Sequence, residues 1–394
     1  MINITDRKTE DKIPPLLRLA FRPFFLLGSL YSIIAVVIWV YAFGHGQPSS
    51  LSVPALWWHV HEMFFGFAMA IVVGFLLTAV QNWTGIKGTN NRWLGLLVLL
   101  WLLPRVLFWT TTPVWLVSIV ESLFLAASAY AVGYRVIKSK KWKNIIFVGF
   151  FILAIVANFA SYATIKGMPP FPSSAVWQAM IWWFVLLLSV MGARVIPFFT
   201  ARKFNFEKAP TLIWLDVFAN LPLLLLFILS FFPIASAQLA APLMIVAGIA
   251  QLVRMARWKP QLTLSEPLVW SLHAAYLCIP IGLIVTGISN DPFLDHSILH
   301  LFAIGSIAGL ILAMITRVTM GHTGHEIYKG PRMWPAFLIL FCGALIRSFG
   351  VAFFPEHMTI LISITALCWT VSFGLFLFYF APMLCKPRID GNPG

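Results

Sequence analysis

Twelve continuously apolar stretches, most of them around twenty residues long, constrain this chain more than any other feature of its sequence. A bilayer core of ~30 Å takes ~20 apolar residues of helix to cross. Only 10% of the residues are charged, whereas a soluble domain averages roughly 25%. The stretches lack the alternation of barrel strands, so they are predicted to be helices. We therefore expect an all-α polytopic membrane protein, with a single integral membrane domain over residues 1–394 and spans near residues 22–44, 57–81, 93–109, 113–137, 143–164, 175–199, 211–232, 234–254, 267–289, 296–320, 333–354 and 358–382.

The distribution of lysine and arginine predicts the orientation of these helices. Cytoplasmic loops carry an excess of both residues. Of the 27 in the chain, 24 lie in the N-terminal segment, the C-terminal tail or alternate connections, whereas Lys166 lies in a connection on the opposite side. Both termini are therefore predicted to be cytoplasmic. The net charge of +14 then reflects topology and attraction to anionic membrane lipid, and no nucleic acid partner is expected.

The start of the chain is expected to stay in the membrane. The first apolar run follows a charged segment and lacks a small-residue cleavage site. It is therefore interpreted as a first span and not as a signal peptide.

Two of the predicted helices repeat one pattern. Residues 61–85 and 300–324 align without gaps, which matches His61 with His300, Gly66 with Gly305, and Thr84-Gly85 with Thr323-Gly324. A weaker third copy ends at Thr200 and has Trp177 at the histidine position. Three copies would correspond to three pseudo-symmetric units of four helices.

Six of the nine histidines are predicted to lie at the outer membrane face: His45, His59, His61, His296, His300 and His357. Histidine is a frequent ligand of metals and of haem iron. The group therefore indicates a metal or haem site, although single interfacial histidines also form hydrogen bonds with loops and headgroups. His322 and His325 are predicted at the cytoplasmic end of the tenth helix.

His61 and His300 are the predicted ligands of a haem. The repeat gives them equivalent positions about one turn inside the outer surface, where two histidines can face each other across a gap in a bundle. The chain has no Cys-x-x-Cys-His motif, so the haem would be b-type and not covalently attached. His59 would replace His61 if the helix were rotated by about half a turn, because residues two apart differ by ~200° in direction.

Arg105 and Arg347 are predicted to lie in the outer halves of their spans. An ionisable group at that depth is costly and usually faces a partner. The two arginines would either bind haem propionates or pair with Glu62 and Glu121, the acids at similar depth. Bidentate pairing with a carboxylate suits the guanidinium group, so both alternatives stay open.

Several motifs in order resemble those of the NnrS family. They are LAFRPFF (19–25), WHVHEM (58–63), GFLLTAVQNWTG (74–85), RVIPFFT (194–200) and RVTMGHTGH (317–325). The resemblance runs from about residue 18 to residue 380. It implies a bacterial inner-membrane protein that contains haem and copper and helps cells tolerate nitric oxide. One departure is Gly192-Ala193, where the family commonly has two glycines.

The copper implied by this resemblance has two alternative locations. Imidazole suits copper, and the outer histidines left after haem ligation could supply a mononuclear site; these are His59, His296, His45 and His357. The alternative is the cytoplasmic pair His322 and His325, which are three residues apart.

A weaker, architectural resemblance links the chain to haem–copper oxidases and nitric oxide reductases. Those enzymes have twelve core helices, haem histidines on helices 2 and 10, and arginines on the haem propionates. They also take metal ligands from helices 6 and 7, and neither run here contains histidine. A copied binuclear centre is therefore not expected.

Two functions from different classes fit these patterns. The first is a haem protein that binds nitric oxide, or reduces it as an oxidoreductase with electrons from a quinol or another donor. The second is a twelve-helix transporter or metal-handling permease, since repeats are common in transporters. The outer position of the histidines and buried arginines, away from the midplane, favours the first.

Overall fold

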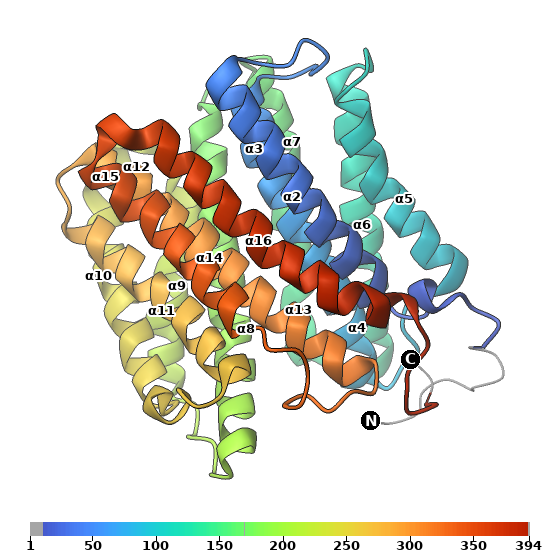
Figure 1. Ribbon diagram of the computed structural model, residues 1–394. Coiled ribbons are helices and arrows are strands. Elements are labelled where there is room, and N and C mark those ends of the chain that lie inside the picture. Colours follow the sequence, from blue (N-terminus) through green and yellow to red (C-terminus); the bar gives the residue numbers. More distant parts are fainter. Residues whose placement is uncertain (1–10, 169, 393–394) are drawn as a thin grey trace. The chain divides into compact units, whose positions relative to one another are not determined.

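The computed structural model describes residues 11–168 and 170–392, and within these ranges the chain forms helices and no strand (Figure 1). Ten of the described helices are long and apolar enough to cross a membrane. The prediction of an all-α polytopic membrane protein is confirmed.

The described residues form twelve helical rods, which lie within a few residues of the predicted spans. They are α2 (Phe21–His45), α3–η2–α4 (Ala55–Thr84), α5 (Asn91–Leu107), α6 (Val114–Ser139), α7 (Ile146–Ile165), α8 (Ser173–Phe204), α9 (Ile213–Leu229), α10 (Pro233–Ala256), α11 (Pro267–Ile288), α12–η5–α13 (Pro292–His322), α14–η6–α15 (Trp334–Phe353) and α16 (Met358–Cys385). Short 3-10 turns lie between or before them: η1 (Pro15–Leu17), η3 (Trp142–Asn144), η4 (Pro260–Leu262) and η7 (Pro355–His357).

Three of the rods contain a π-helical segment. These are η2 (Glu62–Ala68), η5 (Leu301–Ala308) and η6 (Ile346–Gly350). The first two begin at the residue after His61 and the residue after His300. π-Helical segments are rare and are frequent at functional sites. The shared local structure agrees with the ungapped match of the two sequence segments.

The ends of the two matched rods are also alike. Thr84 and Thr323 each donate a side-chain hydrogen bond to the carbonyl four residues earlier, at 2.6 and 2.7 Å. Each is followed by a glycine in the left-handed region, with φ of 71° at Gly85 and 85° at Gly324. Only glycine adopts this region without steric cost, and it commonly stops a helix.

The described chain divides into two compact units. The first comprises residues 11–168 and 170–173 with Ile315–Pro331 and 373–392, and the second comprises Ser174–Met314 and Arg332–Ser372. In the first unit α6 packs against α4, α5 and α7, and α2 packs against α4 and η2. In the second, α10 packs against α9 and α11, and α12 packs against η6. The predicted arrangement of three four-helix units stays a prediction.

Candidate functional site

A cluster of buried polar side chains lies in the first unit, where the α3–η2–α4 rod meets α2, α5, α6 and α7. His61, Glu62 and Glu121 are each at most 1% exposed, and Arg105 is 4% exposed. Tyr31, Asn158 and Tyr162 complete what we call the His61 cluster. A group of charges this deep in apolar helices is costly unless its members satisfy one another.

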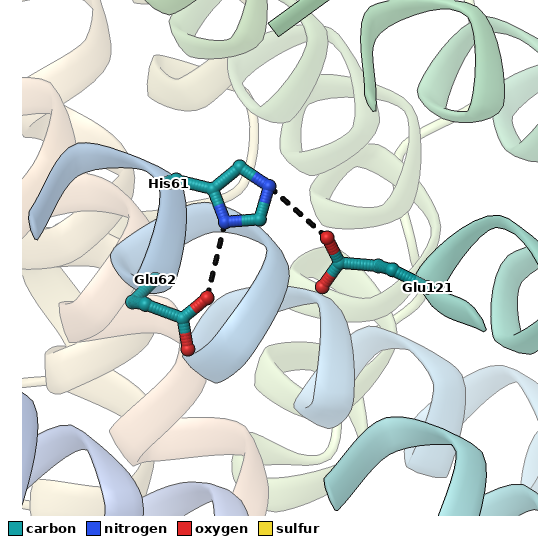
Figure 2. A group of neighbouring side chains, drawn as sticks. All are labelled: His61, Glu62 and Glu121. Carbon is teal, nitrogen blue, oxygen red and sulfur yellow. Dashed lines mark hydrogen bonds and ion pairs between the residues drawn. The ribbon is translucent and has the colours of Figure 1, made fainter. Parts of the chain in front are cut away.

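His61 lies between two carboxylates (Figure 2). Its Nδ1 is 3.0 Å from Oε1 of Glu62, and its Nε2 is 3.0 Å from Oε2 of Glu121. Nε2 also lies 3.3 Å from Oδ1 of Asn158. Each ring nitrogen thus faces an acceptor, Glu62 at Nδ1 and Asn158 at Nε2, with the Glu121 carboxylate beside Nε2. Two ring protons are needed to bond to both sides, and a neutral imidazole carries only one.

Arg105 bonds to both carboxylates from the other side. Its Nε donates to Oε2 of Glu62 at 3.0 Å, and its Nη2 donates to Glu121 and to Oε1 of Glu62, the latter at 3.3 Å. Nη1 donates to the carbonyl of Trp101 at 2.8 Å. The guanidinium is therefore held in place by α5, η2 and α6 together. Of the two alternatives for Arg105, this geometry corresponds to carboxylate pairing.

Two tyrosines complete the bonding of the acids. The Tyr31 hydroxyl donates to Oε2 of Glu62, and the Tyr162 hydroxyl donates to Oε2 of Glu121 at 3.0 Å. Asn158 is fixed by its Nδ2, which donates to the Ser122 hydroxyl at 3.1 Å. Both carboxylates thus accept bonds from groups on several helices, and such networks rigidify a buried site.

Aromatic rings enclose the imidazole. The Trp57 ring stacks on His61 with centroids 4.4 Å apart, and Phe65, Phe108 and Tyr162 pack at 4.9, 5.7 and 4.9 Å. Trp57 is itself held by a bond from its Nε1 to the Ser161 carbonyl. These rings exclude water, which strengthens the electrostatic interactions of the cluster.

The change from α-helix to π-helix occurs between the neighbouring residues His61 and Glu62. His61 ends α3 and Glu62 begins η2, so the backbone changes its winding between them. One turn later Gly66 leaves room for the charges: a Cβ there would lie 2.7 Å from Oε2 of Glu62 and 3.3 Å from Nε of Arg105. The Gly66 carbonyl accepts a bond from Trp101 at 2.8 Å. The glycine is therefore part of the site.

The other outer histidines lie outside the His61 cluster. His59 stacks on Trp39 at 4.4 Å, and His45 is exposed and stacks on Tyr41 at 4.8 Å. His296 is exposed and belongs to the second unit, as does His357, whose Nε2 is 3.7 Å from Glu356. Within residues 11–168 and 170–392, His61, Glu62 and Glu121 form a group of donors close enough to share a metal, their atoms lying within 4.8 Å.

The remaining predicted residues fall in separate surroundings. His300 ends α12 and Arg347 lies in η6; both are partly buried in the second unit, where α12 packs against η6. In the first unit, His325 bonds through Nδ1 to the Thr323 hydroxyl at 2.8 Å, and the His322 ring lies 5.4 Å from that of Phe21.

Sequence reasoning missed three members of the cluster, Tyr31, Asn158 and Tyr162. Asn158 had a usable signal, because an amide within a continuously apolar run needs a partner. The tyrosines had none, since tyrosine is common near membrane interfaces.

Comparison of nearly the whole sequence with known protein families identifies the family. Residues 15–388 match the family described as NnrS protein. The chain belongs to the NnrS family. The match covers the motif around His61 and the one around His322, so the resemblance predicted from the motifs is confirmed. A search of curated proteins finds no match.

Haem is one of the groups that the NnrS resemblance implies, and the geometry allows a test of fit at His61. Both ring nitrogens lie 3.0 Å from carboxylate oxygens. Iron on either nitrogen would require one of these contacts to break and the ring to leave its carboxylate. His61 as placed does not fit haem ligation. His300 lies at the end of α12 in the second unit and stays a prediction as an iron ligand.

A divalent metal in the His61 cluster fits by donor type but not by charge. Imidazole with carboxylates suits copper, zinc or iron. However, two carboxylates and Arg105 already sum to one negative charge, so a divalent ion beside a neutral His61 would leave one positive charge uncompensated. A proton on His61 instead brings the net charge of the cluster to zero. Because an uncompensated buried charge costs about 3–5 kcal/mol, the proton is the favoured occupant.

Proposed function

We propose that this protein acts in the bacterial nitric oxide response and that the His61 cluster is its chemical centre, where it holds a proton. Membership of the NnrS family supports the first part. The observation that carries the second is the position of His61 between Glu62 and Glu121, with Arg105 bonded to both acids. Ionisable groups inside membrane helices commonly serve as proton relays.

Each side chain of the cluster has its own role in stabilising the protonated His61. Glu62 and Glu121 stabilise a doubly protonated His61 from either side, while Arg105 keeps the two carboxylates from repelling each other. Tyr31 and Tyr162 donate to the same acids, so each carboxylate stays in place when His61 loses its proton. Loss of the proton would leave one negative charge on the cluster, and a rise in positive charge nearby would drive that loss.

Haem b and copper belong to this proposal as the groups that the family resemblance implies. Haem would supply an iron that can bind nitric oxide, and reduction would also require electrons from a quinol or another donor. We propose His300 as the iron ligand in this chain, with Arg347 on a propionate. For copper, the exposed His45, His296 and His357 with His59 remain the proposed set, and His322 with His325 the alternative.

The experiment for the role in the cell is gene deletion with complementation. Deletion should make cells sensitive to nitric oxide donors, and the wild-type gene should restore growth. Glu121→Gln, which keeps the shape of the side chain but removes its charge, should fail to restore growth although the protein reaches the membrane. His45→Ala is the matched control, because His45 is exposed and outside the cluster. Unchanged sensitivity of the deletion strain would reject the proposed role.

A proton-coupled transporter is the second candidate, and the charge balance of the His61 cluster favours it over a simple pore. Purified wild-type protein separates the two candidates by its visible spectrum. A Soret band that shifts with nitric oxide supports the first, whereas a colourless protein that carries protons across vesicle membranes supports the second.

A further inference from the structure

A hollow in the second unit lies where the end of α10 meets the start of α9 and the loop before it. The empty space in and in front of it, including space open to solvent, amounts to about 350 Å³. Its polar lining consists mainly of Lys208, Asp216, Arg254 and Arg257, and its apolar lining includes Leu212 and Trp258. These residues come from the connection between α8 and α9, the first turn of α9 and the end of α10.

The hollow is positively charged. Three cationic side chains and one carboxylate line it, which leaves a net charge of +2. Asp216 compensates Arg254 directly, with Oδ1 3.0 Å from Nη1. Lys208 is exposed and Arg257 partly buried, and neither forms an ion pair among those found in the described chain. Their charges are available to an anion that enters the hollow.

Arg254 lines the hollow and is held in place by hydrogen bonds. It is 4% exposed, and its Nη2 donates to the Ser189 hydroxyl at 2.6 Å and to Oε1 of Gln251 at 2.6 Å. Its Nε is buried and has no hydrogen-bond partner among the described residues. A buried donor left without a partner costs about 1–3 kcal/mol, and a bound anion can accept a hydrogen bond from such a donor.

The loop in front of Arg254 is also held in place. Arg257 donates through Nη2 to the carbonyl of Pro210 at 2.8 Å, which fixes the segment that carries Lys208. Ile213 and Trp214, at the start of α9, are 81% and 57% exposed. Large apolar side chains at the end of a membrane helix contact lipid, so the charged hollow opens beside a surface that acyl chains can cover.

We propose that this hollow binds the phosphate of an anionic phospholipid headgroup. Arginine and lysine are the side chains that recognise phosphate, and basic pockets between membrane helices bind such headgroups. Lys208 and Arg257 contact the phosphate, Arg254 backs them, and the lipid's acyl chains lie along α9. The basic-residue count predicts this end of α9 and α10 to be cytoplasmic, where anionic lipid is available.

Thermal unfolding of the full-length protein in a neutral detergent tests the proposal. Phosphatidylglycerol should raise the melting temperature of the wild type by several degrees more than phosphatidylcholine does. Lys208→Ala should reduce this increase, and Lys208→Glu should abolish it. Both variants should melt like the wild type without lipid, because Lys208 is exposed and no hydrogen bond or ion pair found among the described residues involves its side chain.

Arg202→Ala is the matched control. Arg202 is an exposed basic residue near the end of α8 that does not line the hollow, so its variant should respond to phosphatidylglycerol like the wild type. Inorganic phosphate is the second arm: if it alone produces the whole increase, the ligand is a free anion and the lipid assignment is wrong. An equal response of Lys208→Glu and the wild type would overturn the site itself.

Discussion

Gly66 shows how one residue can determine whether a charged cluster forms inside a membrane helix. An added Cβ would lie 2.7 Å from Oε2 of Glu62 and 2.8 Å from the Tyr31 ring. The neighbours are held by Arg105 and by one another, so they cannot move without breaking a bond to a charge. The requirement for glycine at this position is therefore electrostatic as well as steric.

Gly66→Ala is accordingly expected to destabilise the protein. Overpacking a rigid site costs about 1–3 kcal/mol, and the melting temperature in detergent should fall by several degrees. Gly95→Ala is the control, since an added Cβ at Gly95 meets nothing within 4 Å. In a helix that change should be neutral or stabilising by up to ~1 kcal/mol. Equal melting temperatures for both variants would contradict the packing described around Glu62.

Arg105 offers a second test, this time of charge. Arg105→Leu would leave Glu62 and Glu121 with the protonated His61 as their cation, so one negative charge would be uncompensated, and breaking a buried pair costs ~3–5 kcal/mol. Adding Glu121→Gln removes that excess charge. The double variant should therefore be more stable than Arg105→Leu alone, as measured by thermal unfolding. If the second substitution made the protein less stable by its own full cost, Arg105 and Glu121 would not be coupled in the way the geometry indicates.

At the scale of elements, the end of α16 depends on an arginine more than 360 residues away in sequence. Arg22, fully buried at the start of α2, donates through Nη1 to the carbonyls of Met383, Leu384 and Lys386 at 3.2, 2.9 and 2.7 Å. The last four carbonyls of a helix have no partner within it, and a cation there also balances the helix dipole. This contact gives the LAFRPFF motif a structural role.

Arg22→Ala should therefore loosen the C-terminal end of α16. Hydrogen bonds from a charged group contribute about 1.5–3 kcal/mol each, so the free energy of unfolding should fall by ~2 kcal/mol or more. Proteolysis after Cys385 should become faster. Arg22→Lys should recover part of this loss, because its ammonium can still donate to carbonyls. Arg92→Ala is the control on an exposed helix start. Proteolysis of Arg22→Ala at the wild-type rate would show that the end of α16 is held by other contacts.

The elements differ in how far the sequence predicts them. The spans follow from apolar length, which the bilayer thickness sets, and α2 to α16 lie close to the predicted limits. The π-segments η2, η5 and η6 do not follow, because their winding depends on packing between helices. For the site, the sequence places His61 and Arg105 at one depth and names Glu62 and Glu121 as candidate partners. The hydroxyl donors Tyr31 and Tyr162 were not predictable, since their contacts cross between helices.

At the scale of the whole molecule, charges buried within helices differ in role from charges in the connections. Glu62, Glu121 and Arg105 are buried and pair with one another, while lysines such as Lys140 and Lys141 lie in a connection. The orientation prediction depends only on the connections, since loop lysines and arginines near span ends set it. Buried pairs such as Arg105 with Glu121 do not contribute to that count.

The orientation can be tested on one helix. Lys138 lies in the last turn of α6 and Lys166 directly follows α7, so the residues from Trp142 to Ile165 lie between them, long and apolar enough to cross a membrane. Reporter fusions after Ser139 and after Lys166 should therefore report opposite sides, the first cytoplasmic. The reason is the loop with Lys138, Lys140, Lys141 and Lys143, whose positive charge resists translocation, whereas the other side has Lys166. Fusions after Ser139 and Lys166 that report the same side would mean that α7 does not span, and a reversed pair would place both termini outside.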